Sequence, residues 1–325
     1  MRRHVNNPQR ADLLVPLFPM HVIQPVGYHR RATKGEAGMA ESIEIRPTGA
    51  ALGAEVRGVD FSDLDEPTLD QIRAALGEHL VLRFRGTELF DADYMALGRR
   101  LGEIVPPEAH TRTADMTAPE FPEMSVISNI VEGGIAKGEA GDGELSWHTD
   151  HGFMERPAAY TMLLAREVPA QGGDTSFVNM CRVHDEMPDD LRDRVAALSV
   201  KHQGSHGSTG KPRPGYADIA TSDPRELPGA VHPIVRTHLE SGRKALYLGR
   251  RFGSYIPPLP LEESEALLDA LWAEATREEL TWTQSWQVGD LIVWDNRCTM
   301  HRRESFSGQG RRRMHRLMTL GERPV

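Results

Sequence analysis

The amino-acid sequence predicts a mainly β protein with flanking helices, built as a double-stranded β-helix, or jelly-roll, barrel. Two observations lead to this fold class. Many apolar segments have the length of a strand and are separated by turn residues, whereas only a few segments show helical periodicity. The segment 311–320 also alternates, so that Arg312, Met314, Arg316 and Met318 are expected on one face of a strand.

The first part of the chain predicts strands and two helices. Acidic residues and Pro67 mark a helix start, and apolar residues with helical spacing follow up to Gly77. A second apolar stripe ends just before Gly102, a residue that commonly terminates helices. The expected elements are strands at 42–47, within 49–59 and at 80–84, and helices at 67–77 and 91–101.

A long irregular segment follows, and strands then dominate. Residues 105–143 are rich in Pro, Gly, Thr and acidic residues, which is typical of a functional loop or lid, with one strand at 124–130. Residues 204–215 read as a second loop. The further elements expected are strands at 160–165, after the turn 171–177, at 231–237, 244–248, 291–294 and 311–320, and helices at 188–198 and 261–276.

Composition excludes several classes of partner. The 325 residues are 39% hydrophobic and 26% charged, with a net charge of −9, so neither nucleic acid nor an anionic membrane is expected to attract the chain. The two cysteines, Cys181 and Cys298, argue against a disulfide framework and fit a reducing cytoplasm. We expect a cytoplasmic protein with a small-molecule substrate, forming a homo-oligomer such as a dimer or tetramer.

The chain is expected to divide near residue 40. The apolar run 13–23 is interrupted by Pro16 and Pro19 and is too short to cross a bilayer. We expect residues 1–40 to be a loosely ordered extension, with Met39 as an alternative start, and residues 41–325 to be a single jelly-roll domain.

His148, Asp150 and His301 are the candidate metal ligands. Side chains two apart on a strand point to the same face, so His148 and Asp150 could reach one ion. The spacing alone is not specific, because His184 and His238 are also followed by acidic residues. Two histidines and one carboxylate are the ligands of the facial triad of non-haem Fe(II) sites, which leaves three coordination positions open.

The motifs around these residues resemble one family. From residue 43 to the C-terminus, the chain is similar to the Fe(II)- and 2-oxoglutarate-dependent dioxygenases of the taurine and dichlorophenoxyacetate dioxygenase (TauD/TfdA) type. Each motif is weak by itself, but their order and spacing are specific. They are Trp147-His148-Thr149-Asp150, Gly172-Gly173-Asp174-Thr175, Val231-His232-Pro233, Trp294-Asp295-Asn296-Arg297, Met300-His301 and Arg312-Arg313-Met314-His315-Arg316.

The resemblance implies an activity and a cosubstrate site. It implies that Fe(2+), 2-oxoglutarate and O2 are used to hydroxylate an aliphatic C–H bond, with succinate and CO2 as products. By the family spacing, Arg316 binds the 5-carboxylate of 2-oxoglutarate with help from Thr175, and Arg312 lies near the other end of the cosubstrate. An arginine suits this role because its guanidinium binds a carboxylate through two hydrogen bonds.

The substrate is expected to be a small, charged organic molecule. Glu144 stands where taurine dioxygenase has an amide-bearing residue, and no histidine is found at 105–107, which argues against taurine itself. Phe252 matches an aromatic residue that lines the family's substrate pocket, and His151 is a further candidate for substrate contact.

Two alternatives remain open at the level of sequence. A non-redox metal-dependent hydrolase or isomerase could use the same ligands with Zn2+ and without 2-oxoglutarate. A jelly-roll binding protein that has lost catalysis is a second alternative.

Overall fold

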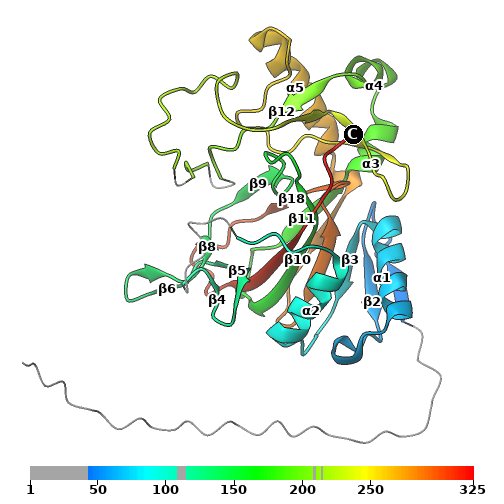
Figure 1. Ribbon diagram of the computed structural model, residues 1–325, viewed down its shortest axis with the longest axis vertical. Helices are drawn as coiled ribbons and strands as arrows, with labels where there is room; N and C mark the ends of the chain where they lie inside the picture. The colour runs from blue at the N-terminus through cyan, green and yellow to red at the C-terminus, as the bar shows by residue number, and fades with distance from the viewer. Residues whose placement is uncertain (1–42, 108–114, 208–209, 214) are drawn as a thin grey trace, which may run out of the picture. The chain divides into compact units, whose positions relative to one another are not determined.

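The computed structural model describes residues 43–107, 115–207, 210–213 and 215–325 (Figure 1). The predicted extension 1–40 lies outside the described residues. Residues 41–325 form one compact unit. The described part of this unit is mainly β, with helices at its periphery, as the sequence predicts.

The larger of the two main sheets runs through the middle of the described unit. Its two central strands, at 158–167 and 291–295, are mostly apolar and largely buried, which is typical of strands covered on both faces. In spatial order its strands are β1 (Glu44–Pro47), β2 (Ala54–Arg57), β3 (Val81–Phe84), β17 (Leu291–Asp295), β10 (Ala158–Glu167), β19 (Arg313–Leu320), β5 (Phe121–Ser128) and β4 (Thr117–Ala118), and β8 (Glu139–Ala140) pairs with β5.

A four-stranded sheet is the second main sheet of the described residues. It joins segments that lie far apart in the sequence, and all of its neighbours are antiparallel. Its order is β16 (Thr281–Gln284), β11 (Thr175–Asn179), β18 (Thr299–Arg303) and β9 (Leu145–His148). These two sheets are consistent with the predicted jelly roll.

Strand alternation divides the apolar residues between two cores. On β10, Met162 and Leu164 belong to the core that packs under the helices α1 and α2, whereas Leu163 belongs to the core shared with the four-stranded sheet. Phe177 and Met300 of the smaller sheet meet Leu163 in that second core. A shift of one residue in register would therefore exchange the two cores.

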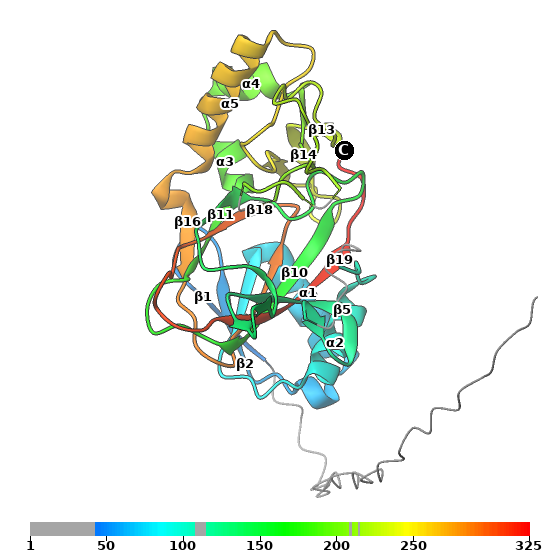
Figure 2. The ribbon, with the colours of Figure 1, turned by 90° about the vertical axis from the view of Figure 1, so that its left-hand side faces the viewer.

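The helices agree with the sequence except around residue 180. Helix α1 (Glu66–His79) starts at Asp65, whose side chain accepts from the Thr68 N–H, and it continues past Gly77 to Leu80 in the left-handed conformation. Helix α2 (Asp91–Leu101) has the predicted bounds. Both pack on the larger sheet. The other helices, α3 (Met180–Glu186), α4 (Asp189–Val195) and α5 (Leu261–Ala275), lie at the opposite end of the unit (Figures 1 and 2).

The helix predicted at 188–198 is present but shorter, and the helix that precedes it was not predicted from the sequence. Two short helices, α3 (Met180–Glu186) and α4 (Asp189–Val195), occupy this region, and α5 follows at Leu261–Ala275. The side chain of Asn179 caps α3 by accepting from the Arg182 N–H. Pro188 then separates the two helices because the residue before a proline is disfavoured in helical conformation.

The segment 105–143 contains more pairing than its composition predicts. Strand β5 begins at Phe121, and the short hairpin β6 (Val131–Glu132) and β7 (Ile135–Ala136) follows it. The remaining elements are β12 (Ser199–Lys201), β13 (Val231–Pro233), β14 (Val235–Thr237), β15 (Lys244–Leu246), η1 (Phe61–Asp63) and η3 (Glu278–Leu280). Within the described ranges, no helix is both long and apolar enough to cross a membrane.

Candidate active site

A cavity of about 260 Å³ lies between the two main sheets. Leu163, Arg316 and Met318 line it from the larger sheet, and His148 and His301 line it from the smaller one. Of the residues that the sequence singles out, the structure brings seven to this cavity: His148, Asp150, His151, Thr175, His301, Arg312 and Arg316.

The three candidate metal ligands meet at the wall formed by β9 and β18. His148 and His301 are directly opposed in the sheet register, and their rings lie 4.2 Å apart between centroids. Asp150 completes the group, with one carboxylate oxygen 3.8 Å from His148 Nε2 and the other 3.9 Å from His301 Nε2. One ligand atom from each residue lies within 4.8 Å of the others, so the group could hold a metal ion.

Asp150 and His148 do not lie on one strand, contrary to the prediction from the sequence. Strand β9 ends at His148, so Asp150 lies in the following turn and not on the strand. His151, the next residue, has a φ of 54°, a left-handed conformation that is uncommon for a residue with a side chain. The turn, and not strand alternation, therefore brings the carboxylate to the imidazole. Such backbone strain is frequent at functional sites.

The protonation of the site suits a metal. His148 Nδ1 lies 2.7 Å from the carbonyl oxygen of Ser146, which can only accept, so Nδ1 carries the proton and Nε2 faces the cavity with its lone pair. Burial lowers the pKa of His148, which keeps the imidazole neutral. Burial opposes ionisation of Asp150, but His301 and Arg316 nevertheless hold its pKa below the usual range. Two neutral imidazoles and a carboxylate fit Fe(II).

Thr175 and Arg312 form a second polar group in the cavity. Thr175 Oγ1 accepts a hydrogen bond of 3.0 Å from the indole N–H of Trp286. The guanidinium of Arg312 lies 5.8 Å from the ring centre of Trp286 and 5.7 Å from that of Phe306. Burial lowers the pKa of Arg312 to about 9, with the charge of Arg303 as the next cause. Arg312 therefore lies at the Thr175 end.

Arg316 lies at the other end, beside the candidate metal ligands. Its Nη2 donates to Glu139 Oε1 at 2.6 Å. Burial is the main cause of the lowered pKa of His301, and the charge of Arg316 lowers the pKa values of both His301 and Asp150. The two arginines thus stand in the reverse order to that implied by the resemblance, which pairs Arg316 with Thr175.

Comparison with known proteins decides the family. The sequence model described as "Taurine catabolism dioxygenase TauD, TfdA family" matches residues 44–318. This chain belongs to the TauD/TfdA family. It is a 2-oxoglutarate-dependent dioxygenase that uses Fe(II), 2-oxoglutarate and O2, as predicted.

Similar proteins align with most of the length of this chain. It is 32% identical over 294 residues to an alpha-ketoglutarate-dependent 2,4-dichlorophenoxyacetate dioxygenase of Burkholderia sp. (strain RASC), covering 88% of this chain and 92% of the relative. It is 33% identical over 300 residues to an alpha-ketoglutarate-dependent sulfate ester dioxygenase of Pseudomonas putida, with the same coverage of 88% and 92%. The crystal structure of a taurine dioxygenase from Burkholderia xenovorans superposes with a TM-score of 0.72 at 30% identity, covering 87% of this chain and 91% of that one.

The structure does not bring two substrate candidates of this dioxygenase to the cavity. Glu144 is exposed, and its neighbour Leu145 lines the cavity instead. Phe252 is 55% exposed and contacts the ring of His206, whereas Arg250, two residues earlier, faces the cavity. Both positions follow irregular backbone, where a family alignment does not determine which side chain points inward.

Sequence reasoning missed a cationic group in the dioxygenase cavity. Lys211, Arg213 and Arg250 line it, and Arg213 and Arg250 both donate to the carbonyl oxygen of His206, at 3.4 and 3.5 Å. Burial, and after it the charge of Arg213, lowers the pKa of Arg250 to about 10. The signal available in the sequence was two basic residues inside the predicted loop 204–215.

Proposed function

We propose that this dioxygenase hydroxylates an aliphatic C–H bond of a small organic anion while 2-oxoglutarate is converted to succinate and CO2. The observation that supports this proposal is the convergence of three groups on one cavity. These groups are the His–Asp–His cluster, the Thr175 and Arg312 pair, and the cationic group of Lys211, Arg213 and Arg250.

His148, Asp150 and His301 would hold Fe(II) at one wall of this cavity. Bound there, the metal would supply the redox chemistry that couples O2 and 2-oxoglutarate to substrate oxidation. The chain's own contribution is to fix the ligands: the Ser146 carbonyl orients the ring of His148, and burial keeps water from competing for the imidazole nitrogens. Three coordination positions would remain for cosubstrate and O2.

Arg312 and Thr175 would hold the distal carboxylate of 2-oxoglutarate. Phe177 is opposite His301 in the sheet, and Thr175 is two residues further along the same face, which corresponds to about 7 Å. That separation suits a five-carbon dianion that reaches from the metal to a cation. The indole N–H of Trp286 already donates to Thr175 Oγ1, so the Thr175 hydroxyl proton is available to donate to the carboxylate.

Arg316 would face the carboxylate that binds beside the metal. Its ion pair with Glu139 orients the guanidinium, and its charge favours an anion next to Asp150. This assignment exchanges the roles that the resemblance gives to Arg312 and Arg316, and it follows from the position of Arg312 beside the Trp286 ring.

Lys211, Arg213 and Arg250 would bind an anionic group of the primary substrate. They form a cationic group distinct from the Thr175 and Arg312 pair assigned to the cosubstrate, and the buried guanidinium of Arg250 interacts favourably with negative charge. The names of two relatives point the same way, because dichlorophenoxyacetate and sulfate esters are both anions. The carboxylate of Glu144 would suit a cationic group on the substrate, but Glu144 is exposed and does not line the cavity.

The decisive experiment is anaerobic addition of Fe(II) and 2-oxoglutarate, followed by visible absorption spectroscopy. We expect a weak metal-to-ligand charge-transfer band, and succinate formation when O2 and a suitable carboxylate, sulfonate or sulfate ester are added. Folded protein without that band would contradict the proposal. Zn2+-dependent turnover without 2-oxoglutarate would instead support the hydrolase or isomerase alternative, which the comparisons do not support.

A further inference from the structure

A closed set of buried hydrogen bonds surrounds Asp150. The indole N–H of Trp294 donates to Asn296 Oδ1 at 3.0 Å, and Asn296 Nδ2 donates to Thr161 Oγ1 at 2.7 Å. Thr161 Oγ1 in turn donates to Asp150 Oδ2 at 2.9 Å. The backbone N–H of Asp150 returns to Asn296 Oδ1 at 3.4 Å. Thr161 and Asn296 are almost completely inaccessible to solvent.

The direction of every bond in this set is determined by chemistry. An indole nitrogen can only donate, so the amide oxygen of Asn296 faces Trp294 and its NH2 group faces Thr161. The hydroxyl of Thr161 accepts from that NH2 group, and its single proton is therefore directed at Asp150. Asp150 Oδ2 is consequently held as an acceptor, while no hydrogen bond to Oδ1 is found among the described residues.

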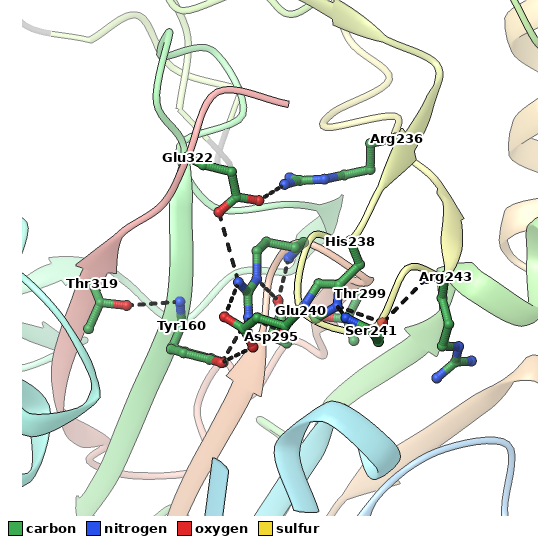
Figure 3. A network of polar contacts seen from close by, with 11 residues as sticks. Tyr160, Arg236, His238, Glu240, Ser241, Arg243, Asp295, Thr299, Thr319 and Glu322 are labelled. Atoms are coloured by element: carbon green, nitrogen blue, oxygen red, sulfur yellow. Dashed lines mark hydrogen bonds and ion pairs between the residues drawn. The ribbon is translucent and has the colours of Figure 1, made fainter. Parts of the chain in front are cut away.

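Asp295, which directly precedes Asn296 in the chain, is held by a separate network of polar contacts that includes His238 and Thr299 (Figure 3). The carboxylate of Asp295 accepts from the guanidinium of Arg297 at 2.8 and 2.7 Å and lies 3.1 Å from His238 Nε2. The hydroxyl of Thr299 donates to the Asp295 carbonyl oxygen at 2.8 Å. Arg297 also donates to the hydroxyl of Tyr160 at 2.8 Å. Displacement of the backbone that carries Asn296 would therefore require rearrangement of this buried ionic network.

We propose that Thr161 and Asn296 are positioning residues for the metal site, which fix the Asp150 carboxylate so that Oδ1 is presented to the ion. This inference rests on the proposed role of Asp150 as a ligand. It assigns a function to Asn296 in the Trp294-Asp295-Asn296-Arg297 motif, which the cosubstrate and substrate sites leave unexplained. A carboxylate that is free to rotate would have to be ordered by the metal, and outer partners of this kind typically contribute a 10- to 100-fold effect on metal affinity.

The test compares two isosteric substitutions of buried threonines. Thr161→Val removes the donor to Asp150 and keeps the shape. Thr319→Val is the matched control, because within the described part of the chain Thr319 Oγ1 accepts only from the Tyr160 N–H, at 3.0 Å. Affinity is measured anaerobically by titrating Fe(II) into the apoprotein, and thermal unfolding of the apoprotein reports the fold. If Thr161→Val does not fold, Thr161→Ala takes its place.

We expect Thr161→Val to weaken Fe(II) binding by about 10-fold or more and to shift the visible band of the Fe(II) and 2-oxoglutarate complex. The thermal midpoint of its apoprotein should stay close to that of Thr319→Val. Thr161→Ser, which restores the hydroxyl, should recover the affinity. Asn296→Leu should behave as Thr161→Val does. Wild-type affinity in folded Thr161→Val, or an equal loss in Thr319→Val, would overturn the proposal. Failure of the wild-type protein to bind Fe(II) would instead contradict the proposed function.

Discussion

Replacing Arg312 separates the two possible arrangements of the cosubstrate. The guanidinium is almost fully buried beside Trp286 and Phe306, and its Nε has no hydrogen-bond partner within the described part of the chain. A dianion that reaches the Thr175 end would supply the missing negative charge. Arg312→Met removes the cation while keeping an apolar side chain of similar length.

The expected loss follows from the burial of this pair. Truncating one partner of a buried, hydrogen-bonded charge pair costs about 2–5 kcal/mol, much of it because the other charge is left unpaired. Since each 1.4 kcal/mol is about tenfold, the dissociation constant of 2-oxoglutarate should rise by roughly 30-fold or more. Arg312→Lys should recover only part of the loss, because an ammonium keeps the charge without the planar fork.

The same substitution should not reduce the thermal stability of the apoprotein, and it is expected to maintain or increase it. Burial lowers the pKa of Arg312 to about 9, so in the apoprotein the fold compensates this charge only in part, through Asp174. Replacing an uncompensated buried ion with an apolar side chain is often neutral or stabilising. We therefore expect the thermal midpoint of apo Arg312→Met to equal or exceed that of the wild type, which would show that weaker binding is not a consequence of unfolding.

The assay is an anaerobic titration of Fe(II)-loaded protein with 2-oxoglutarate, followed by the visible band. Arg313→Ala is the control, since Arg313 is an exposed neighbour on the other face of β19 that pairs with Glu167. Normal 2-oxoglutarate binding by Arg312→Met, together with a large loss in Arg316→Ala, would refute the proposed exchange. The order implied by the family resemblance would then hold.

Three further predictions concern the other parts of the molecule. Replacing any one candidate ligand with alanine (His148→Ala, Asp150→Ala or His301→Ala) should abolish Fe(II) binding and substrate-dependent succinate formation while the fold survives. Near-normal metal binding in one of these variants would show that its residue is not a ligand. Arg250→Ala should raise the KM for an anionic substrate about tenfold or more with little change in 2-oxoglutarate affinity, whereas an equal effect on both would assign Arg250 to the cosubstrate. Burial lowers the pKa of His202 to about 3, so as the pH falls the imidazole takes up a proton in the unfolded chain before it does so in the folded protein. The free energy of unfolding should therefore decrease between about pH 6.5 and pH 3, with a slope of up to ~1.4 kcal/mol per pH unit. His202→Leu should flatten that slope in urea unfolding at pH 7, 5 and 4, and parallel pH profiles would show that another group titrates.

Local pattern was sufficient for most of the elements and for naming the candidate ligands. Helix α2 has its predicted bounds because one apolar stripe and Gly102 are local signals. The alternation of 311–320 correctly predicted that Arg312, Arg316 and Met318 face one side, where all three line the cavity. His148 and Asp150 were recognisable because the chain itself fixes their separation at two residues, whether a strand or a turn joins them.

Tertiary structure alone decided how these side chains are arranged around one another. Arg312 and Arg316 share a strand face, so periodicity could not tell which of them lies near Thr175; the pairing of β11 with β18 and the position of Trp286 determine that. Arg250 lies on irregular backbone, where no periodicity predicts which side chains face the cavity. The sequence by itself therefore determined the fold class, the family and the candidate ligands, because these depend on local spacing. The order of the arginines, the cationic group in the cavity and the hydrogen bonds around Asp150 were decided by contacts between separate segments, such as the bond between Asn296 and Thr161, which are 135 residues apart. The relative positions of these segments depend on packing and on no local signal.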